Sequence, residues 1–191
     1  MNWEVIIKYL PKLLEGAWLT LELVGIAVIA GLILAIPLGV ARASQHWYVR
    51  VFPYSYIFFF RGTPLLVQLF LVYYGLPQFD IIREGPLWPY LRSPFWCAAI
   101  TMTLHTAAYI AEIIRGAIQA IPAGEIEAAR ALGMSKWQTL IYITMPRATR
   151  IGLPAYSNEV ILMLKASALA STITLLELTG MARTIIARTY L

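Results

Sequence analysis

Long apolar stretches separated by short polar segments run through the whole chain. A helix needs about 20 predominantly apolar residues to cross the hydrocarbon core of a bilayer. Stretches that reach this length occupy residues 17–41, 51–76, 95–114 and 151–176. The pattern therefore predicts an all-α integral membrane protein with four transmembrane helices, built as a single transmembrane domain over residues 1–191.

The composition agrees with this fold class and argues against several others. Hydrophobic residues make up 60% of the 191 positions and charged residues only 13%, whereas about 25% is usual for soluble domains. Cys97 is the single cysteine, so a disulfide framework is excluded. His46 and His105 fit no metal-binding spacing, and we expect no metal site. The net charge of +5 comes from basic residues beside apolar stretches, which favours membrane orientation over nucleic-acid binding.

The polar connections predict how the spans are oriented. Residues 42–50 hold two arginines and no acid, and residues 115–150 are also rich in arginine and lysine. Residues 77–94 balance their acids and bases. Because basic residues gather on the cytoplasmic side, we expect residues 42–50 and 115–150 in the cytoplasm, and residues 77–94 and the amino terminus outside. Residues 1–15 lack the features of a cleavable signal and predict an amphipathic segment on the membrane surface.

Polar side chains inside the predicted spans are costly and therefore suggest function. Arg61 precedes Gly62 and Pro64, which interrupt the helical hydrogen bonds and leave carbonyl groups without amide donors. We favour Arg61 as the donor to these carbonyls over direct contact with a substrate, and we keep it among the residues of the candidate pathway. Gln68 is a second candidate for that pathway. For His105 the sequence leaves open whether it is packed or faces the pathway.

The last span is the most polar. Helical spacing places Asn158, Glu159 and Met163 on one broad stripe, together with small residues that permit close approach of a neighbouring helix. Glu159 is the strongest candidate for a substrate contact, because a carboxylate neutralises a cationic substrate and accepts a guanidinium bidentately. The alternative is a structural ion pair with Lys165 or with an arginine of a partner subunit.

The cytoplasmic connection within residues 120–150 predicts two short helices. A run of good helix formers ends at Gly133, which suits a left-handed cap. Ser135 followed by Gln138 predicts a capping box that opens the second helix, and we expect Pro146 to close it. From physical chemistry alone, an amphipathic helix lying on the lipid headgroups is an equal alternative to a protein-docking unit.

Within this connection, EAARALGMSKWQTLIYITMP resembles the cytoplasmic loop of permease subunits of ATP-binding-cassette importers. The pattern is EAA, three residues, Gly, nine residues, Ile, any residue, Leu and Pro; only Met145 departs from it, in place of Leu. The resemblance implies that this loop docks on an ATPase. The coupling residues that it implies are Glu127, Ala128, Ala129, Leu132 and Gly133.

The resemblance extends over most of the chain, through RGTPLLVQLFLVYYGLP, AAYIAEIIRGAIQAIPAGEIEAARALGMSKW and LPAYSNEVILMLKASALASTITLLELTG. These stretches resemble permeases of polar amino-acid importers, in particular the histidine, arginine/ornithine and octopine/nopaline systems. The resemblance implies a complex in the bacterial inner membrane with a second permease, two ATPases and a periplasmic amino-acid-binding protein. It also implies cationic or opine-like substrates. The family has a fifth span that we expect to be missing after residue 176.

The sequence therefore predicts a transport subunit that forms half of a translocation pathway. It shows no catalytic constellation and no phosphate-binding GxxxxGK[ST] loop, so we expect no cofactor in this chain and ATP on the partner ATPase. The alternative is an ion-coupled secondary transporter subunit, which would leave the EAA loop unexplained. An intramembrane enzyme would need paired nucleophile and base residues that the sequence does not offer.

Overall fold

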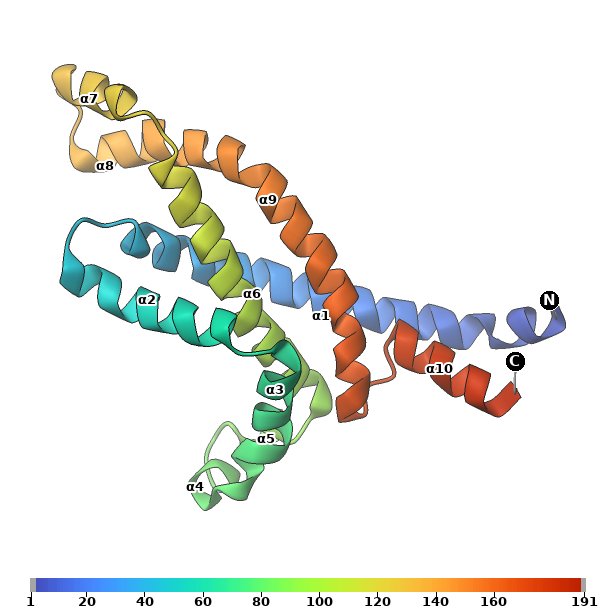
Figure 1. The fold of residues 1–191 in the computed structure, drawn as a ribbon. Helices are drawn as coiled ribbons and strands as arrows, with labels where there is room; N and C mark the ends of the chain where they lie inside the picture. Colours follow the sequence, from blue (N-terminus) through green and yellow to red (C-terminus); the bar gives the residue numbers. More distant parts are fainter. Residues whose placement is uncertain (1–2, 190–191) are drawn as a thin grey trace.

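The computed structural model describes residues 3–189, which form helices and turns and contain no strand. Two long helices make its frame (Figure 1). Helix α1 covers Trp3–Arg42 and helix α6 covers Pro94–Gln119. Helix α6 packs along α1 and also contacts α2, α3 and α9. Both α1 and α6 are long and apolar enough to cross a membrane unaided, and two bent helix pairs bring the possible spans to four within the described residues.

Helix α1 differs from the sequence prediction at its beginning. Residues 1–15 were predicted to be an amphipathic segment on the membrane surface; residues 1–2 lie outside the described part, and residues 3–15 continue into the first span as one helix of 40 residues. Pro11 lies inside this helix and does not end it. Pro11 is in the third turn, where its missing amide removes a single intrahelical hydrogen bond, and the rest of the helix continues.

The second predicted span is not one straight helix. Helix α2 (Trp47–Gly62) and the helical segment that follows meet at an angle of 100°. Thr63 and Pro64 have extended backbone at the break. This is the conformation expected for the residue before a proline and for a proline that cannot donate to the helix. The sequence predicted the position of the interruption, but the direction of the chain after it depends on packing against α6.

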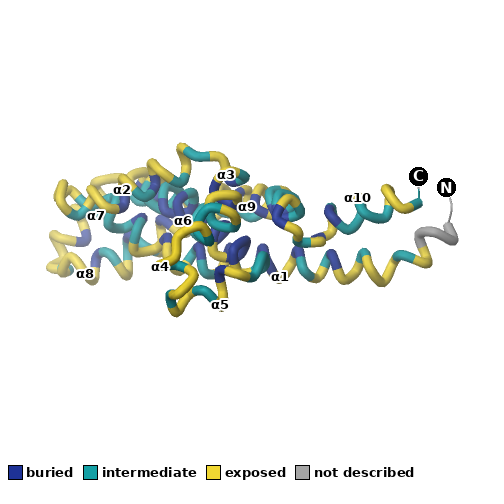
Figure 2. The backbone as a smooth tube through the Cα atoms, turned by 90° about the horizontal axis from the view of Figure 1, so that it is seen from below, coloured by how far each residue is buried: buried dark blue, intermediate teal, exposed yellow. Residues whose placement is uncertain are grey.

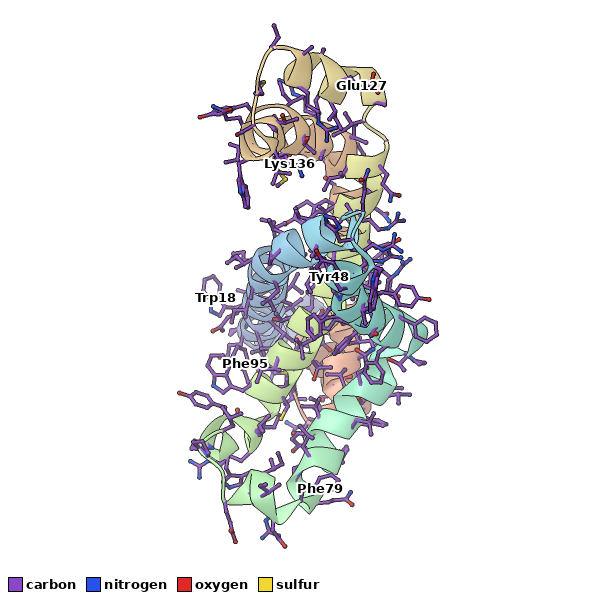
Figure 3. The ribbon with its side chains drawn as sticks, turned by 90° about the vertical axis from the view of Figure 1, so that its left-hand side faces the viewer. Trp18, Tyr48, Phe79, Phe95, Glu127 and Lys136 are labelled. Atoms are coloured by element: carbon purple, nitrogen blue, oxygen red, sulfur yellow. The ribbon has the colours of Figure 1, made fainter. Side chains whose placement is uncertain are left out.

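Short elements continue the chain after this bend and lead back to α6. They are α3 (Leu65–Phe70), the π-helical η1 (Leu71–Gly75), the 3-10 helix η2 (Leu76–Gln78), α4 (Asp80–Arg83) and α5 (Trp88–Leu91). Figure 3 places Phe79, in this region, at the opposite end of the molecule from Glu127. The connection of residues 77–94 and the loop of residues 120–150 that contains the EAA sequence (the EAA loop) therefore lie on opposite sides of the helix bundle.

After α6 the chain turns back through a second helical hairpin. Its elements are α7 (Ala123–Ala131), α8 (Lys136–Gln138), the π-helical η3 (Thr139–Thr144), α9 (Met145–Ala166) and the 3-10 helix η4 (Ser167–Ile173). From Lys136 to Ile173 these elements form one continuous helical rod. The predicted end at Pro146 is wrong. The carbonyl that its ring would meet belongs to Tyr142, in the widened π turn directly before it, and that widening accommodates the ring.

The last helix, α10 (Leu178–Thr189), is bent by 54° from the preceding rod and lies beside α1 (Figure 1). Thr174 makes the bend with a φ of 72°, an uncommon value for a β-branched residue. The Thr20 hydroxyl on α1 accepts the backbone N–H of Leu178 at 3.1 Å. Glu177 is 1% exposed, and its carboxylate caps α10 by accepting the amides of Thr179 and Gly180.

The core lies around α6, where helices α1, α3 and α9 meet it. Figure 2 shows that buried residues gather there, while the α7–α8 end is mostly exposed. The largest buried cluster contains Leu23, Leu69, Met102 and Met163 from four different segments. Small residues such as Ala107 and Ala108 let neighbouring helices approach closely, as is usual between membrane helices. Helix α6 therefore positions the polar groups described next.

Candidate functional site

A row of polar side chains follows α6 through the middle of the bundle. The row consists of His105, Thr106, Tyr109 and Glu112, spaced so that they lie within about two turns of one side of the helix. Each of them contacts a polar or charged group from another segment or from the next turn. We call this set the α6 polar row.

Gln68, in the first turn of α3, supplies hydrogen-bond donors to backbone carbonyls at the break between α2 and α3. Its amide Nε2 donates to the carbonyl of Phe60 at 2.9 Å and to the carbonyl of Thr63 at 3.1 Å. Its carbonyl oxygen lies 3.0 Å from Nδ1 of His105 in the polar row. The sequence interpretation that Arg61 serves these carbonyls is therefore wrong. A carboxamide fits better, because it donates to the freed carbonyls and accepts from the histidine at once.

Arg61 turns instead toward α6. Its guanidinium lies over the ring of Tyr109 at 5.2 Å, and Nη1 is 4.0 Å from the carboxylate of Glu112. Glu112 also accepts from Nε and Nη2 of Arg115, one turn further along α6, at 2.8 and 2.6 Å. The Arg61 side chain remains 43% exposed. Arg61, Tyr109 and Glu112 line a cavity of about 380 Å³ to which Arg42 and Tyr54 also contribute.

Glu159 on α9 points toward α6 and is 6% exposed. The Thr106 hydroxyl donates to its Oε1 at 3.0 Å. No described side-chain oxygen or nitrogen is both fully buried and without a hydrogen-bond partner. The second carboxylate oxygen, which has no recorded partner within residues 3–189, therefore keeps some access to the outside. Among the described residues Glu159 forms no ion pair with Lys165, one of the two pairings that the sequence suggested, and the neutral Thr106 hydroxyl is its donor instead.

The structure divides the other predicted pathway residues between two environments. Gln68 and Met163 are 3% and 2% exposed and belong to the interior. Asn158 is exposed, as is Arg61. The stripe of Asn158, Glu159 and Met163 therefore wraps around α9, with only its carboxylate and thioether turned into the helix bundle.

The EAA loop has the local structure that its sequence predicts. Gly133 has a φ of +80° and ends α7, and the Ser135–Gln138 capping box makes both of its hydrogen bonds. Glu125 binds Arg147 through two hydrogen bonds of 2.6 and 3.0 Å, so α7 is fastened to the beginning of α9. Ala129 on α7 is buried.

The end of this loop presents an apolar surface to the outside. Leu132 is 83% exposed, Trp137 73%, Ile141 55% and Tyr142 67%. Ile126 and Ala129 of the preceding turns pack inward, whereas Leu132 does not. We call Leu132, Trp137, Ile141 and Tyr142 the loop patch. Glu127 and Ala128, also predicted for coupling, are exposed on the outer side of α7.

Sequence reasoning identified candidate residues on α2, α3 and α9 but missed their partners Thr106 and Tyr109 on α6. Thr106 carried no signal, because a threonine within an apolar helix usually bonds to its own backbone. Tyr109 resembled any aromatic residue of a membrane helix. The polar spacing of 105, 109 and 112 on α6 was visible in the sequence and indicated a common face.

Comparison with known proteins gives consistent matches along the chain. Residues 27–189 match the family described as "Binding-protein-dependent transport system inner membrane component". The octopine transport system permease protein OccM of Rhizobium meliloti is 49% identical over 188 residues, which are 98% of this chain and 75% of that protein. The nopaline permease NocM of Agrobacterium fabrum is 46% identical, covering 100% of this chain and 79% of NocM.

Similar values hold for the histidine/lysine/arginine/ornithine permease HisM of Salmonella typhimurium, which is 43% identical over 98% of this chain and 83% of HisM. Among solved structures, an amino acid ABC transporter crystallised with histidines superposes with a TM-score of 0.85 at 37% identity, covering 100% of this chain and 85% of its own. The inward-facing MetNI methionine ABC transporter shares the fold, with a TM-score of 0.71 at 21% identity over 91% of this chain and 77% of its own.

Proposed function

Because the chain belongs to the family of binding-protein-dependent transport system inner membrane components, we propose that it is a permease subunit of an ATP-binding-cassette importer of amino acids or opines. Three relatives support this directly: permeases for octopine, for nopaline and for histidine, lysine, arginine and ornithine are 43–49% identical over nearly the whole chain. The single observation that carries the mechanism is the exposed loop patch at the end of a continuous helical rod.

The loop patch is suited to binding a groove on an ATPase. Its large apolar side chains are mostly exposed, and aromatic residues of this kind anchor protein interfaces. The carboxylate and alanines of Glu127, Ala128 and Ala129 form the adjoining turn of α7. A lipid-facing helix is the alternative from physical chemistry, and the paired charges of Glu125 and Arg147 beside the patch favour a protein surface.

A continuous helix connects the loop patch to the part of α9 that contains Glu159. Trp137 and Glu159 belong to the same helical rod, which runs without a break from Lys136 to Ile173. The bond between Glu125 and Arg147 fixes α7 to that rod. A displacement of the loop by an ATPase is therefore carried to the α6–α9 contact at Thr106 and Glu159, where it alters the packing that encloses the carboxylate.

We assign the substrate contact to Glu159 and Asn158 on α9, with Arg61 and Gln68 shaping the wall beside the α6 polar row and Met163 forming the apolar floor. Glu159 supplies the negative charge that a guanidinium or ammonium group requires when it leaves water. Opening of the α6–α9 contact would expose both of its oxygens. Cationic and opine-like amino acids are therefore the proposed substrates.

The proposed assembly contains a second permease, identical or paralogous, that provides the other half of the pathway about a two-fold axis. Two ATPases bind the loop patches and carry the ATP, and a periplasmic binding protein delivers the substrate. The site is in the bacterial inner membrane, with the amino terminus in the periplasm and the EAA loop in the cytoplasm. The opposite placement of Glu127 and Phe79 in Figure 3 and the basic residues of the loop support this orientation.

Reconstitution tests the proposal. The full chain is placed in proteoliposomes with its ATPase, the paralogous permease if one is encoded, and the binding protein, and uptake of labelled arginine is measured. Uptake that requires internal ATP and external binding protein supports the proposal. Uptake driven by a proton or sodium gradient without ATP would support the secondary-transporter alternative, which no observation on the described residues favours.

A further inference from the structure

The turn between α1 and α2 forms a small basic cavity that the transport mechanism does not use. Helix α1 ends at Arg42 and α2 begins at Trp47, and the short connection between them brings arginines of both helices to one side. The cavity has a volume of about 230 Å³ and is lined by Arg42, Trp47, Arg50, Val51 and Tyr54. No acidic residue contributes to its wall.

Neither guanidinium of this cavity has a carboxylate within 4.0 Å among residues 3–189. The nearest acidic group in the neighbouring cavity is Glu112, which is held by Arg115 at 2.6 Å and approached by Arg61. Two arginines facing a common space without an acid between them leave that space strongly positive. An anion there would form the charge-assisted, forked hydrogen bonds for which guanidinium is suited.

Arg42 is held in position by an aromatic ring. Its guanidinium lies 5.0 Å from the centre of the Tyr54 ring, a cation–π contact between the end of α1 and the second turn of α2. Stacking uses the face of the guanidinium and leaves its N–H edge for hydrogen bonding. One of the two guanidinium groups of the cavity is therefore positioned before any anion binds.

The surroundings of the cavity indicate a lipid. Trp47 and Tyr48 are 72% and 64% exposed at the start of α2, and tryptophan and tyrosine of membrane proteins concentrate at the level of the headgroups. The turn lies at the same end of the molecule as α7 and α8 (Figure 1). Arg42 and Tyr54 also line the neighbouring cavity, which continues along α2 past Phe58, a residue that is 69% exposed.

We propose that the α1–α2 turn binds the headgroup phosphate of an anionic phospholipid, with Arg42 and Arg50 as its ligands. The acyl chain follows the exposed apolar side of α2 from Val51 to Phe58. Basic pockets on the cytoplasmic side of membrane helices are suited to such headgroups. A free phosphate would satisfy the arginines but would leave the apolar track beside them unused.

The test measures lipid retained by the full chain, purified with its transport partners, by native mass spectrometry after delipidation. Phosphatidylglycerol and phosphatidylcholine are added back separately. The expected result is preferential binding of phosphatidylglycerol, lowered about tenfold to thirtyfold in the double variant Arg42→Gln/Arg50→Gln. The matched control Arg83→Gln/Arg92→Gln removes two arginines from the opposite end of the molecule and is expected to keep the preference.

Three outcomes overturn the proposal. One is equal binding of the two lipids by the unmodified chain, and another is an unchanged preference in Arg42→Gln/Arg50→Gln. The third is displacement of the lipid by inorganic phosphate at equal concentration, which would identify a free-anion site. If the glutamine variant does not fold, Arg42→Lys/Arg50→Lys retains the charge but loses the forked geometry, and its preference for phosphatidylglycerol must then still decrease.

Discussion

Thr106 on α6 donates a hydrogen bond of 3.0 Å to Glu159 on α9, although the two residues are 53 positions apart in the sequence. This bond joins the helix that carries the polar row to the rod that begins at the EAA loop. Glu159, the carboxylate that we propose as the substrate contact, therefore also holds α6 and α9 together. These two helices must move apart before a substrate can reach it.

Replacing Glu159 by glutamine separates these two roles. We expect Glu159→Gln to reduce uptake of arginine more than uptake of a neutral amino acid, because the amide keeps the hydrogen bond to Thr106 but loses the charge. Competition assays in the reconstituted complex measure the ratio. The control Thr106→Val removes the bond and retains the charge, and it should affect both substrates alike. Equal loss of both substrates in Glu159→Gln would indicate a purely structural carboxylate.

We also expect the Thr106→Val variant to be slightly less stable than the unmodified protein. Hydrogen bonds between membrane helices contribute about 0.6 kcal/mol on average and at most about 1.7 kcal/mol. The variant should therefore unfold only slightly more easily in detergent. A loss well above that range would mean that Thr106 supports more than this single contact.

Gln68 is expected to matter more for stability than its neutral side chain suggests. In Gln68→Leu the carbonyls of Phe60 and Thr63 lose their donor, and leaving such acceptors unpaired costs about 1–3 kcal/mol. Thermal unfolding of the purified protein measures the change. The matched control is Gln78→Leu, at an exposed glutamine that only donates to the carbonyl of Tyr74. Similar melting temperatures for the two variants would refute the role of Gln68 at the break.

Gly133 is predicted to be sensitive to any side chain. Its φ of +80° is unfavourable for other residues, and valine there costs about 1–2 kcal/mol. Gly133→Val should leave expression normal and uncouple ATP hydrolysis from uptake, since the angle between α7 and α8 would change. Gly124→Val in the same loop is the control, because Gly124 has open space around it and no positive φ. Normal uptake by Gly133→Val would contradict the docking role of the loop.

A further prediction concerns Glu177, which caps α10 where this helix packs against α1. Glu177→Ala removes the cap of α10 and empties a fully buried position, so α10 should detach from α1 more often. The loss of a helix cap costs about 0.5–2 kcal/mol. Hydrogen exchange over residues 178–189 should accelerate in this variant and stay unchanged in Glu84→Ala, whose side chain is exposed. Unchanged exchange in both would show that packing alone holds α10.

The sequence predicted best what depends on neighbouring residues. The cap at Gly133 and the box formed by Ser135 and Gln138 follow from interactions across a single turn, and the structure contains both. The break at Pro64 was visible for the same reason. The helix was wrongly predicted to end at Pro146, because a widened π turn before it accommodates the proline ring. The local composition does not indicate such a turn.

Contacts between segments that are distant along the chain could not be predicted from the sequence. Gln68 was singled out, but its partners across the break and on α6 depend on the 100° bend. Arg61 was expected at the carbonyls and lies over Tyr109 instead, because that bend turns α2 toward α6. Helical spacing placed Asn158 and Glu159 on one stripe, yet packing against α6 buried only the second.

Site-directed cross-linking of the loop patch tests the central claim most directly. Leu132→Cys places a reactive thiol on the most exposed residue of the patch, while the native Cys97 is buried, so the unmodified chain serves as background. In membranes that contain the complete transporter, we predict a cross-link from this position to the ATPase and none from Phe79→Cys. A thiol at residue 132 that reacts with a membrane-impermeant reagent from the periplasm, or that cross-links to no ATPase, would contradict the account.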